Sequence, residues 1–148
     1  MDTLVKTLGE LETEVGRFVG TLSHKKDGAT LVTLSGDLGA GKTAFTKAIA
    51  HALGIEETVT SPTFVLEKIY KLGGPTPKFK NLIHIDAYRL EAGSDLGALG
   101  FDELMQNAGN LIMLEWPEKV ADALPIPAVR ISIVMNPDDS RTLSYSYA

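Results

Sequence analysis

The spacing of hydrophobic residues predicts how the chain begins. From Thr7 onward, apolar side chains recur at intervals of three and four residues, the period of a helix with one buried face. Thr7 and Glu10 together have the form of a capping box, so we expect the helix to begin there. A polar turn at 24–28 leads to a short apolar run at 30–34, which predicts a buried strand. The helical positions are Leu8, Leu11, Val15, Phe18, Val19 and Leu22.

Beyond this strand, the pattern predicts an alternation of helices, strands and hairpins. A helix is expected over 41–53, ended by Gly54 in the position of a left-handed C-cap. Glycine interrupts the apolar groups of 91–105, which predicts short helices there. Pro117 suits the first turn of a helix that runs to Ala123. The remaining strands are expected over 63–71 and 80–88 as one hairpin, over 111–116, and over 128–135 and 141–147 as a terminal hairpin.

A glycine-rich segment joins the first predicted strand to the second predicted helix. It matches the Walker A pattern, which requires a strand before the loop and a helix after it. Glycine lets successive main-chain N–H groups point at a phosphate, and the helix N-terminus adds the positive end of its dipole. Lys42 would reach the β- and γ-phosphates and the Thr43 hydroxyl would face Mg²⁺, so we expect ATP and Mg²⁺ as cofactors. The expected nucleotide contacts in this segment are Gly36, Asp37, Leu38, Gly39, Ala40, Gly41, Lys42, Thr43 and Ala44.

Two apolar runs each end in a carboxylate, at Asp86 and at Glu115. Open α/β sheets place ligand groups at the carboxyl ends of their strands, and a P-loop site needs an acid there to hold Mg²⁺. An acid in such a position can also only cap the next element, so neither residue identifies a site alone. The presence of two such acids in the same chain as a Walker A segment favours a role in the nucleotide site over simple capping. The spacing does not decide which of the two acids binds the metal.

A turn and a single tryptophan add weaker signals. Thr60, Ser61 and Thr63 surround a proline shortly after the second predicted helix. Nucleotide switches often carry such hydroxyls to sense the γ-phosphate, although Ser and Thr before Pro are also ordinary turn residues. Trp116, the only tryptophan, directly follows Glu115, and this position favours proximity to the nucleotide.

Composition narrows the class of protein. At 148 residues the chain is expected to form one domain, 1–148, and 44% hydrophobic with 22% charged residues is a globular mixture. No apolar stretch is long enough to span a bilayer and no secretory signal is recognisable, so we expect a cytoplasmic protein without a membrane contact. The absence of cysteine excludes disulfides and thiolate chemistry. A net charge of -5 argues against a broad nucleic-acid face, so no direct DNA binding is expected and any RNA would be contacted through a partner.

Four segments together resemble the TsaE family, small P-loop ATPases of bacterial tRNA modification. They are GDLGAGKT at 36–43, TSPTF at 60–64, HIDAYR at 84–89 and LEWPE at 114–118, in that order. The resemblance implies a P-loop NTPase-like α/β fold of three layers, with a mostly parallel sheet, an antiparallel extension and flanking helices. It also implies an accessory ATPase that associates with TsaB and TsaD homologues and supports threonylcarbamoyl transfer to an adenosine of tRNA.

The same resemblance implies roles for individual residues. Lys42 and Thr43 would serve phosphate and Mg²⁺, Glu115 would join the metal shell, and Asp86 would position or activate water. Asp86 and Lys42 are therefore the expected catalytic residues, and Thr43 and Glu115 the expected metal ligands. Residues 60–63 would form a switch-like loop, and Trp116 would lie near the nucleotide.

Two other functions stay open for this pattern of residues. A small-molecule kinase uses the same loop, but such enzymes usually close an arginine-bearing lid over the reaction, and this chain has only four arginines. An ATP-gated assembly switch with negligible hydrolysis is harder to dismiss, because a partner can complete such a site. GTP is less expected than ATP, since no Asn-Lys-x-Asp segment is present to read guanine.

Overall fold

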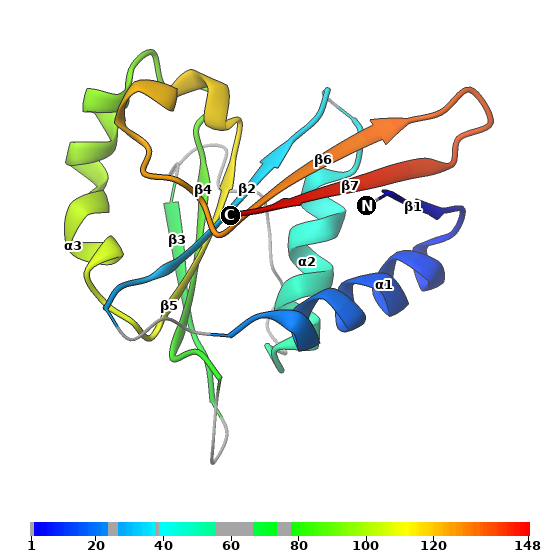
Figure 1. Ribbon diagram of the computed structural model, residues 1–148, viewed down its shortest axis with the longest axis horizontal. Helices are drawn as coiled ribbons and strands as arrows, with labels where there is room; N and C mark the ends of the chain where they lie inside the picture. The colour runs from blue at the N-terminus through cyan, green and yellow to red at the C-terminus, as the bar shows by residue number, and fades with distance from the viewer. Residues whose placement is uncertain (1, 24–26, 38, 56–66, 74–77) are drawn as a thin grey trace.

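The computed structural model describes residues 2–23, 27–37, 39–55, 67–73 and 78–148. Within these residues, seven strands form one sheet in the order β1-β7-β6-β2-β5-β4-β3 (Figure 1). The strands are β1 (Asp2–Val5), β2 (Thr30–Ser35), β3 (Glu67–Lys71), β4 (Asn81–Asp86), β5 (Asn110–Glu115), β6 (Val129–Met135) and β7 (Arg141–Tyr147).

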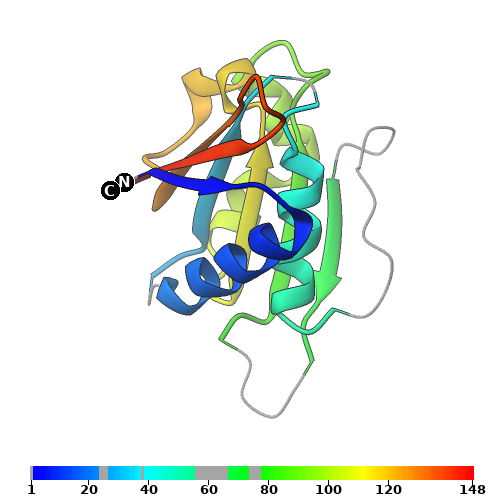
Figure 2. The same ribbon diagram turned by 90° about the vertical axis from the view of Figure 1, so that its right-hand side faces the viewer.

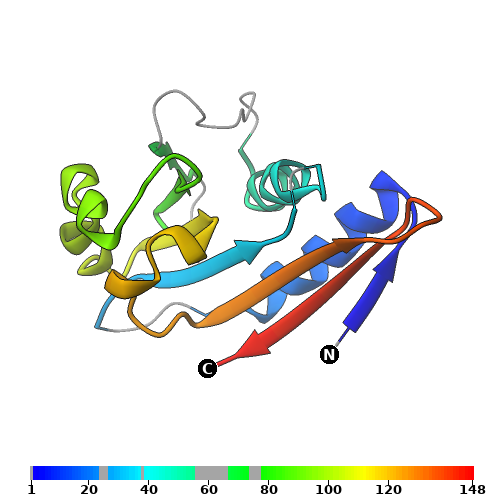
Figure 3. The same ribbon diagram turned by 90° about the horizontal axis from the view of Figure 1, so that it is seen from above.

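The middle of the sheet is parallel and both of its edges are antiparallel. β2 lies between β5 and β6 and runs parallel to both, and β4 runs parallel to β5. β3 pairs antiparallel with β4 at one edge, while β7 and then β1 extend the other edge (Figure 3). β1 therefore points in the same direction as the four central strands. The expected mostly parallel sheet with an antiparallel extension is confirmed.

Helices cover both faces of this sheet. One face carries the two longer helices and the other carries the shorter ones, so that the molecule has three layers (Figures 1 and 2). β5 shows the reason: Leu111 and Met113 belong to the buried cluster under the longer helices, and Ile112 and Leu114 belong to the cluster on the opposite face. The three-layer α/β fold is thereby confirmed. The helices are α1 (Leu8–Thr21), α2 (Lys42–Ala52), α3 (Phe101–Met105) and the 3₁₀ segments η1 (Gly93–Leu99), η2 (Pro117–Lys119) and η3 (Ala121–Ala123).

α1 begins where the sequence predicts. The Glu10 N–H donates to Thr7 Oγ1 at 3.0 Å, and the Thr7 N–H donates to Glu10 Oε2 at 3.2 Å, which completes the capping box. Val15 and Phe18 of the apolar stripe are fully buried, and the Phe18 ring stacks on Tyr145 of β7 with 5.3 Å between centroids. The stripe therefore fastens α1 to the antiparallel edge of the sheet.

The first strand, β1, is an element that the sequence analysis did not predict. Its four residues contain one buried side chain, Val5, so no clear alternation of polar and apolar positions marks them. The strand forms because the edge of β7 offers main-chain partners from Arg141 to Ser144. Its existence depends on residues more than a hundred positions away, which local pattern analysis does not connect.

Several other predictions are confirmed and one is wrong. The two hairpins form, as β3 with β4 and β6 with β7, and short helices fill 93–105. Residues 63–66 of the first expected strand lie outside the described residues. The single helix expected from Pro117 to Ala123 is wrong, because it is divided into two 3₁₀ turns. Val120 separates them with φ -131° and ψ 21°, outside the helical range, while its side chain is completely buried.

Candidate functional site

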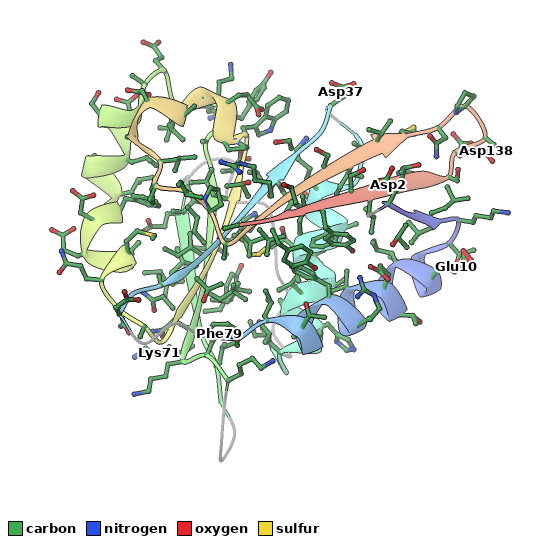
Figure 4. The ribbon with its side chains drawn as sticks, viewed as in Figure 1. Asp2, Glu10, Asp37, Lys71, Phe79 and Asp138 are labelled. Atoms are coloured by element: carbon green, nitrogen blue, oxygen red, sulfur yellow. The ribbon has the colours of Figure 1, made fainter. Side chains whose placement is uncertain are left out.

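The phosphate-loop segment lies between the end of β2 and the start of α2. Gly36 is held against β6, where an added Cβ would lie 2.6 Å from the carbonyl oxygen of Ile133, so only glycine fits without a shift of the main chain. Gly41 has φ 107° and precedes the first residue of α2. The helix N-terminus, with its unpaired N–H groups, therefore faces the loop, and Figure 4 labels Asp37 where the loop leaves β2.

Lys42 turns back over this loop. Its ammonium donates hydrogen bonds to the carbonyl oxygens of Gly36 and of Asp37, the latter at 3.0 Å, and it lies 4.2 Å from the ring centroid of Trp116. Only 6% of the residue is exposed, and this burial lowers the pKa of Lys42, while Glu115 and Asp86 act in the opposite direction. A cationic group is thus fixed at the loop, beside two acids.

The two predicted acids lie side by side at the carboxyl ends of β4 and β5. Asp86 and Glu115 are register partners in this parallel pair, and both are buried. The Tyr88 N–H donates to Asp86 Oδ1 at 3.0 Å. Burial raises the pKa of Asp86, the neighbouring Glu115 raises it further, and the hydrogen bond from Tyr88 opposes the rise. The structure therefore brings Lys42, Asp86 and Glu115 to one place.

His84 is a residue of this site to which the sequence analysis assigned no role. It is fully buried, and its Nε2 shares a hydrogen bond with Glu115 Oε2. Its Nδ1 has no hydrogen-bond partner among the described residues. The available signal was its spacing: residues two apart on a strand share a face, so His84 lies on the same side of β4 as Asp86.

Trp116 lies beside Lys42 and also packs against the apolar cluster on the face of the sheet that carries the shorter helices. Its φ of 60° and ψ of 52° turn the chain sharply after β5, and its N–H donates to the Leu34 carbonyl of β2 at 3.2 Å. The ring is half-buried and packs against Tyr88, with 4.9 Å between ring centroids. The Trp116 ring therefore contacts both the Lys42 ammonium and the Tyr88 ring.

Arg141 is a second residue that the sequence analysis missed. From the start of β7, its Nε donates to the Ala40 carbonyl at 3.1 Å and its Nη1 donates to the Asp139 carbonyl at 2.6 Å. It thus ties the glycine loop to the terminal hairpin. No local signal marks it, because Arg141 and Ala40 are 101 residues apart in the chain.

The structure describes some of the remaining predicted site residues and leaves others outside the described ranges. Thr43 and Ala44 are half-buried in the first turn of α2, next to Lys42. Leu38 and the switch residues Thr60, Ser61 and Thr63 lie outside the described residues. In the part of the chain that the structure describes, no group of three or more metal-ligating side chains is found. A Mg²⁺ ion, which commonly uses one or two carboxylates together with water and phosphate oxygens, does not need such a group.

Comparison with known proteins places this arrangement in a family. The sequence model of "Threonylcarbamoyl adenosine biosynthesis protein TsaE" matches residues 9–143, a range that contains the loop, both acids and Trp116. The chain belongs to the TsaE family. The resemblance carried by the four sequence segments is thereby confirmed. Among the described residues, no helix has both the length and the apolar content needed to cross a bilayer.

Individual relatives match most of this chain. The chain is 40% identical to the tRNA threonylcarbamoyladenosine biosynthesis protein TsaE of Bacillus subtilis (strain 168) over 126 residues, which are 85% of this chain and 74% of the relative. It is 39% identical to the protein of that name from Treponema pallidum (strain Nichols) over 87% of this chain and 88% of the relative. The crystal structure of YdiB from Bacillus subtilis superposes with a TM-score of 0.76 at 28% identity, over 99% of this chain and 84% of that one.

Proposed function

We propose that this protein is an accessory Mg²⁺-dependent ATPase that supports threonylcarbamoyladenosine modification of tRNA. The observation that carries the proposal is the meeting of Lys42, at the N-terminus of α2, with two buried carboxylates at the ends of β4 and β5. A cation and helix N–H groups bind polyphosphate, and acids at strand ends hold a metal or a water molecule. The description of the family to which the chain belongs names threonylcarbamoyl adenosine biosynthesis.

The residues of the site fit a magnesium nucleotide. The main-chain N–H groups at the start of α2 and the Lys42 ammonium would bind phosphate oxygens. Mg²⁺ prefers oxygen ligands, and the Thr43 hydroxyl and the Glu115 carboxylate supply them. When bound, Mg²⁺ neutralises charge on the β- and γ-phosphates. His84 holds Glu115 from within the sheet through their shared hydrogen bond.

Asp86 has the position and the basicity to orient water. It lies beside Glu115 at the end of the adjacent strand, and one of its oxygens is fixed by the Tyr88 N–H at 3.0 Å. Burial raises its pKa, so its carboxylate is a stronger acceptor for a water proton than a solvated aspartate would be. We therefore assign the water-positioning role to Asp86 and the phosphate-binding role to Lys42.

The proposed partners are TsaB and TsaD homologues, with tRNA reached through them. A net charge of -5 agrees with indirect contact, because a protein that grips nucleic acid itself usually presents a basic face. The proposal places the protein in the cytoplasm. We expect weak hydrolysis by the isolated protein and a higher rate with the partner complex, because partner groups often complete auxiliary P-loop sites.

Release of inorganic phosphate tests the proposal directly. The protein is incubated with ATP and Mg²⁺, alone and with TsaB and TsaD homologues, and phosphate is measured over time. Asp86→Asn is expected to keep ATP binding and to lower the partner-stimulated rate by a factor of about 100 or more, as is typical when a group that transfers or orients a proton is removed. Asp102→Asn, at an exposed acid of α3, is the matched control and should behave as the unchanged protein. Full turnover by Asp86→Asn would show that the assigned role is wrong.

The same reaction separates the two alternatives. A small-molecule kinase would transfer phosphate to an added hydroxyl metabolite instead of releasing it. An ATP-gated assembly switch would bind the partner complex in the presence of ATP, yet release no phosphate even when all components are present. Phosphate release that needs no acceptor and rises with the partners supports the ATPase.

A further inference from the structure

His84 and Glu115 form a buried polar pair at the carboxyl ends of β4 and β5. Both residues are buried, and His84 Nε2 is hydrogen-bonded to Glu115 Oε2. Because an ionised carboxylate can only accept hydrogen bonds, Nε2 is the donor. Nδ1 of the same ring has no hydrogen-bond partner among the described residues. Within this part of the chain, the bond to Glu115 is therefore the polar contact that orients the imidazole.

The main chain of Glu115 is held without help from His84. The Ala87 N–H, just after β4, donates to the Glu115 carbonyl at 3.0 Å. On the other side, the Trp116 N–H donates to the Leu34 carbonyl of β2 at 3.2 Å. These bonds fix the strand end but leave the side-chain torsions of Glu115 free to choose among rotamers. The hydrogen bond from His84 removes that choice, because it anchors one of the two carboxylate oxygens.

The anchored oxygen limits how Glu115 can bind an ion. Since Oε2 accepts from the imidazole, Oε1 is the oxygen left for coordination. Mg²⁺ suits such an arrangement, because it demands near-ideal octahedral geometry and usually keeps several water ligands beside one or two carboxylates. Ca²⁺ is larger, takes roughly six to eight oxygens, and often binds a carboxylate through both of its oxygens. A carboxylate with one available oxygen therefore favours Mg²⁺ over Ca²⁺.

We propose that His84 sets the metal selectivity of this site by keeping Glu115 monodentate, a proposal that rests on the proposed binding of ATP with Mg²⁺. His84 is a positioning residue, since it acts through Glu115. Replacement of a group that hydrogen-bonds a metal ligand typically changes metal affinity by about 10- to 100-fold. Loss of the His84 donor releases Oε2, so Glu115 can turn and offer both oxygens to a larger ion.

Calorimetric titration with ATP, in the presence of Mg²⁺ or of Ca²⁺, tests the proposal. The readout is the ratio of the two dissociation constants, and the unchanged protein should bind ATP more tightly with Mg²⁺. His84→Leu has no donor, and it should weaken binding with Mg²⁺ about tenfold while binding with Ca²⁺ stays equal or becomes tighter. His84→Gln carries an amide N–H at a similar distance from the main chain, so it should keep the ratio of the unchanged protein.

Tyr145→Phe is the matched control, because it removes the donor of another buried carboxylate. Tyr145 Oη donates to Glu14 Oε2 at 2.6 Å, and the pair joins β7 to α1. In the sheet, β7 is separated from β5 by β6 and β2, so this pair lies away from the two acids. Its loss should lower stability and leave the ratio unchanged, which separates metal selectivity from a general effect on the fold.

The ratio decides the proposal. An unchanged ratio in folded His84→Leu would overturn it, as would an equal change in His84→Gln or in Tyr145→Phe, or an unchanged protein that binds ATP equally well with both metals. If His84→Leu does not fold, His84→Met, which also lacks a donor, decides in its place. If the unchanged protein binds no ATP, or binds it equally well with Mg²⁺ and with a chelator of divalent ions, the proposed function itself fails. The two failures are therefore distinguishable.

Discussion

Lys42→Ala removes the ammonium that the structure places between the phosphate loop and the two acids. In the structure, this group donates to the carbonyls of Gly36 and Asp37 and lies over the Trp116 ring. Binding of ATP would exchange these contacts for charged phosphate oxygens, so the net gain is smaller than for a solvated lysine. A charge-assisted hydrogen bond contributes about 1.5 to 3 kcal/mol, and the exchange places the expected loss near 1.5 to 2 kcal/mol. That loss corresponds to a dissociation constant about tenfold to thirtyfold higher.

Fluorescence of Trp116 can follow the titration, because it is the only tryptophan and its ring centroid is 4.2 Å from the Lys42 nitrogen. Since the substitution also changes the surroundings of the ring, calorimetry should supply the affinities that are compared. Lys47→Ala, at an exposed lysine of the same helix, changes the net charge equally and should bind ATP normally.

The effect on folding should be small. Burial disfavours the charged form of Lys42 and lowers its pKa, so removal of the charge relieves a cost while it also removes two hydrogen bonds. These contributions oppose each other, and we expect the free energy of unfolding to change by less than about 1 kcal/mol. If folded Lys42→Ala bound ATP within twofold of the unchanged protein, the assignment of Lys42 to the phosphates would be refuted.

Three further predictions follow from buried contacts. Glu14, whose pKa is lowered by its hydrogen bond from Arg17, should stabilise the fold when ionised, so Glu14→Gln should lower the free energy of unfolding at pH 7 by about 1 to 2 kcal/mol. That difference should shrink as pH falls below 4.5, the ordinary glutamate value, toward the lower folded pKa, and urea unfolding at several pH values measures it. Gly36→Ala would bring a Cβ 2.6 Å from the Ile133 carbonyl and should destabilise the protein by about 1 to 3 kcal/mol in thermal unfolding, and an unchanged melting temperature would contradict this. His84→Leu leaves the buried carboxylate at the end of β5 without this donor and should cost about 1 to 3 kcal/mol, whereas His84→Gln, which keeps an N–H group, should cost less in the same measurement.

Local sequence patterns were sufficient to predict those elements whose stabilising contacts join residues that are close along the chain. The capping box of Thr7 and Glu10, the glycine loop and the helix after it depend on hydrogen bonds within a few residues, so their residue types predict them. The strands that end in Asp86 and Glu115 were recognisable because strands buried on both faces consist of nearly continuous apolar residues. The class of fold and most of the candidate site could therefore be predicted from the sequence.

Only the tertiary structure decided which distant segments meet. The parallel register of β4 and β5 brings Asp86 beside Glu115, and alternation along the same strand brings His84 to that carboxylate. β1 forms because β7 provides an edge, and Arg141 reaches the loop from the end of the chain. These contacts depend on strand order and register, which are set by the packing of the whole sheet, and no window of neighbouring residues contains that information.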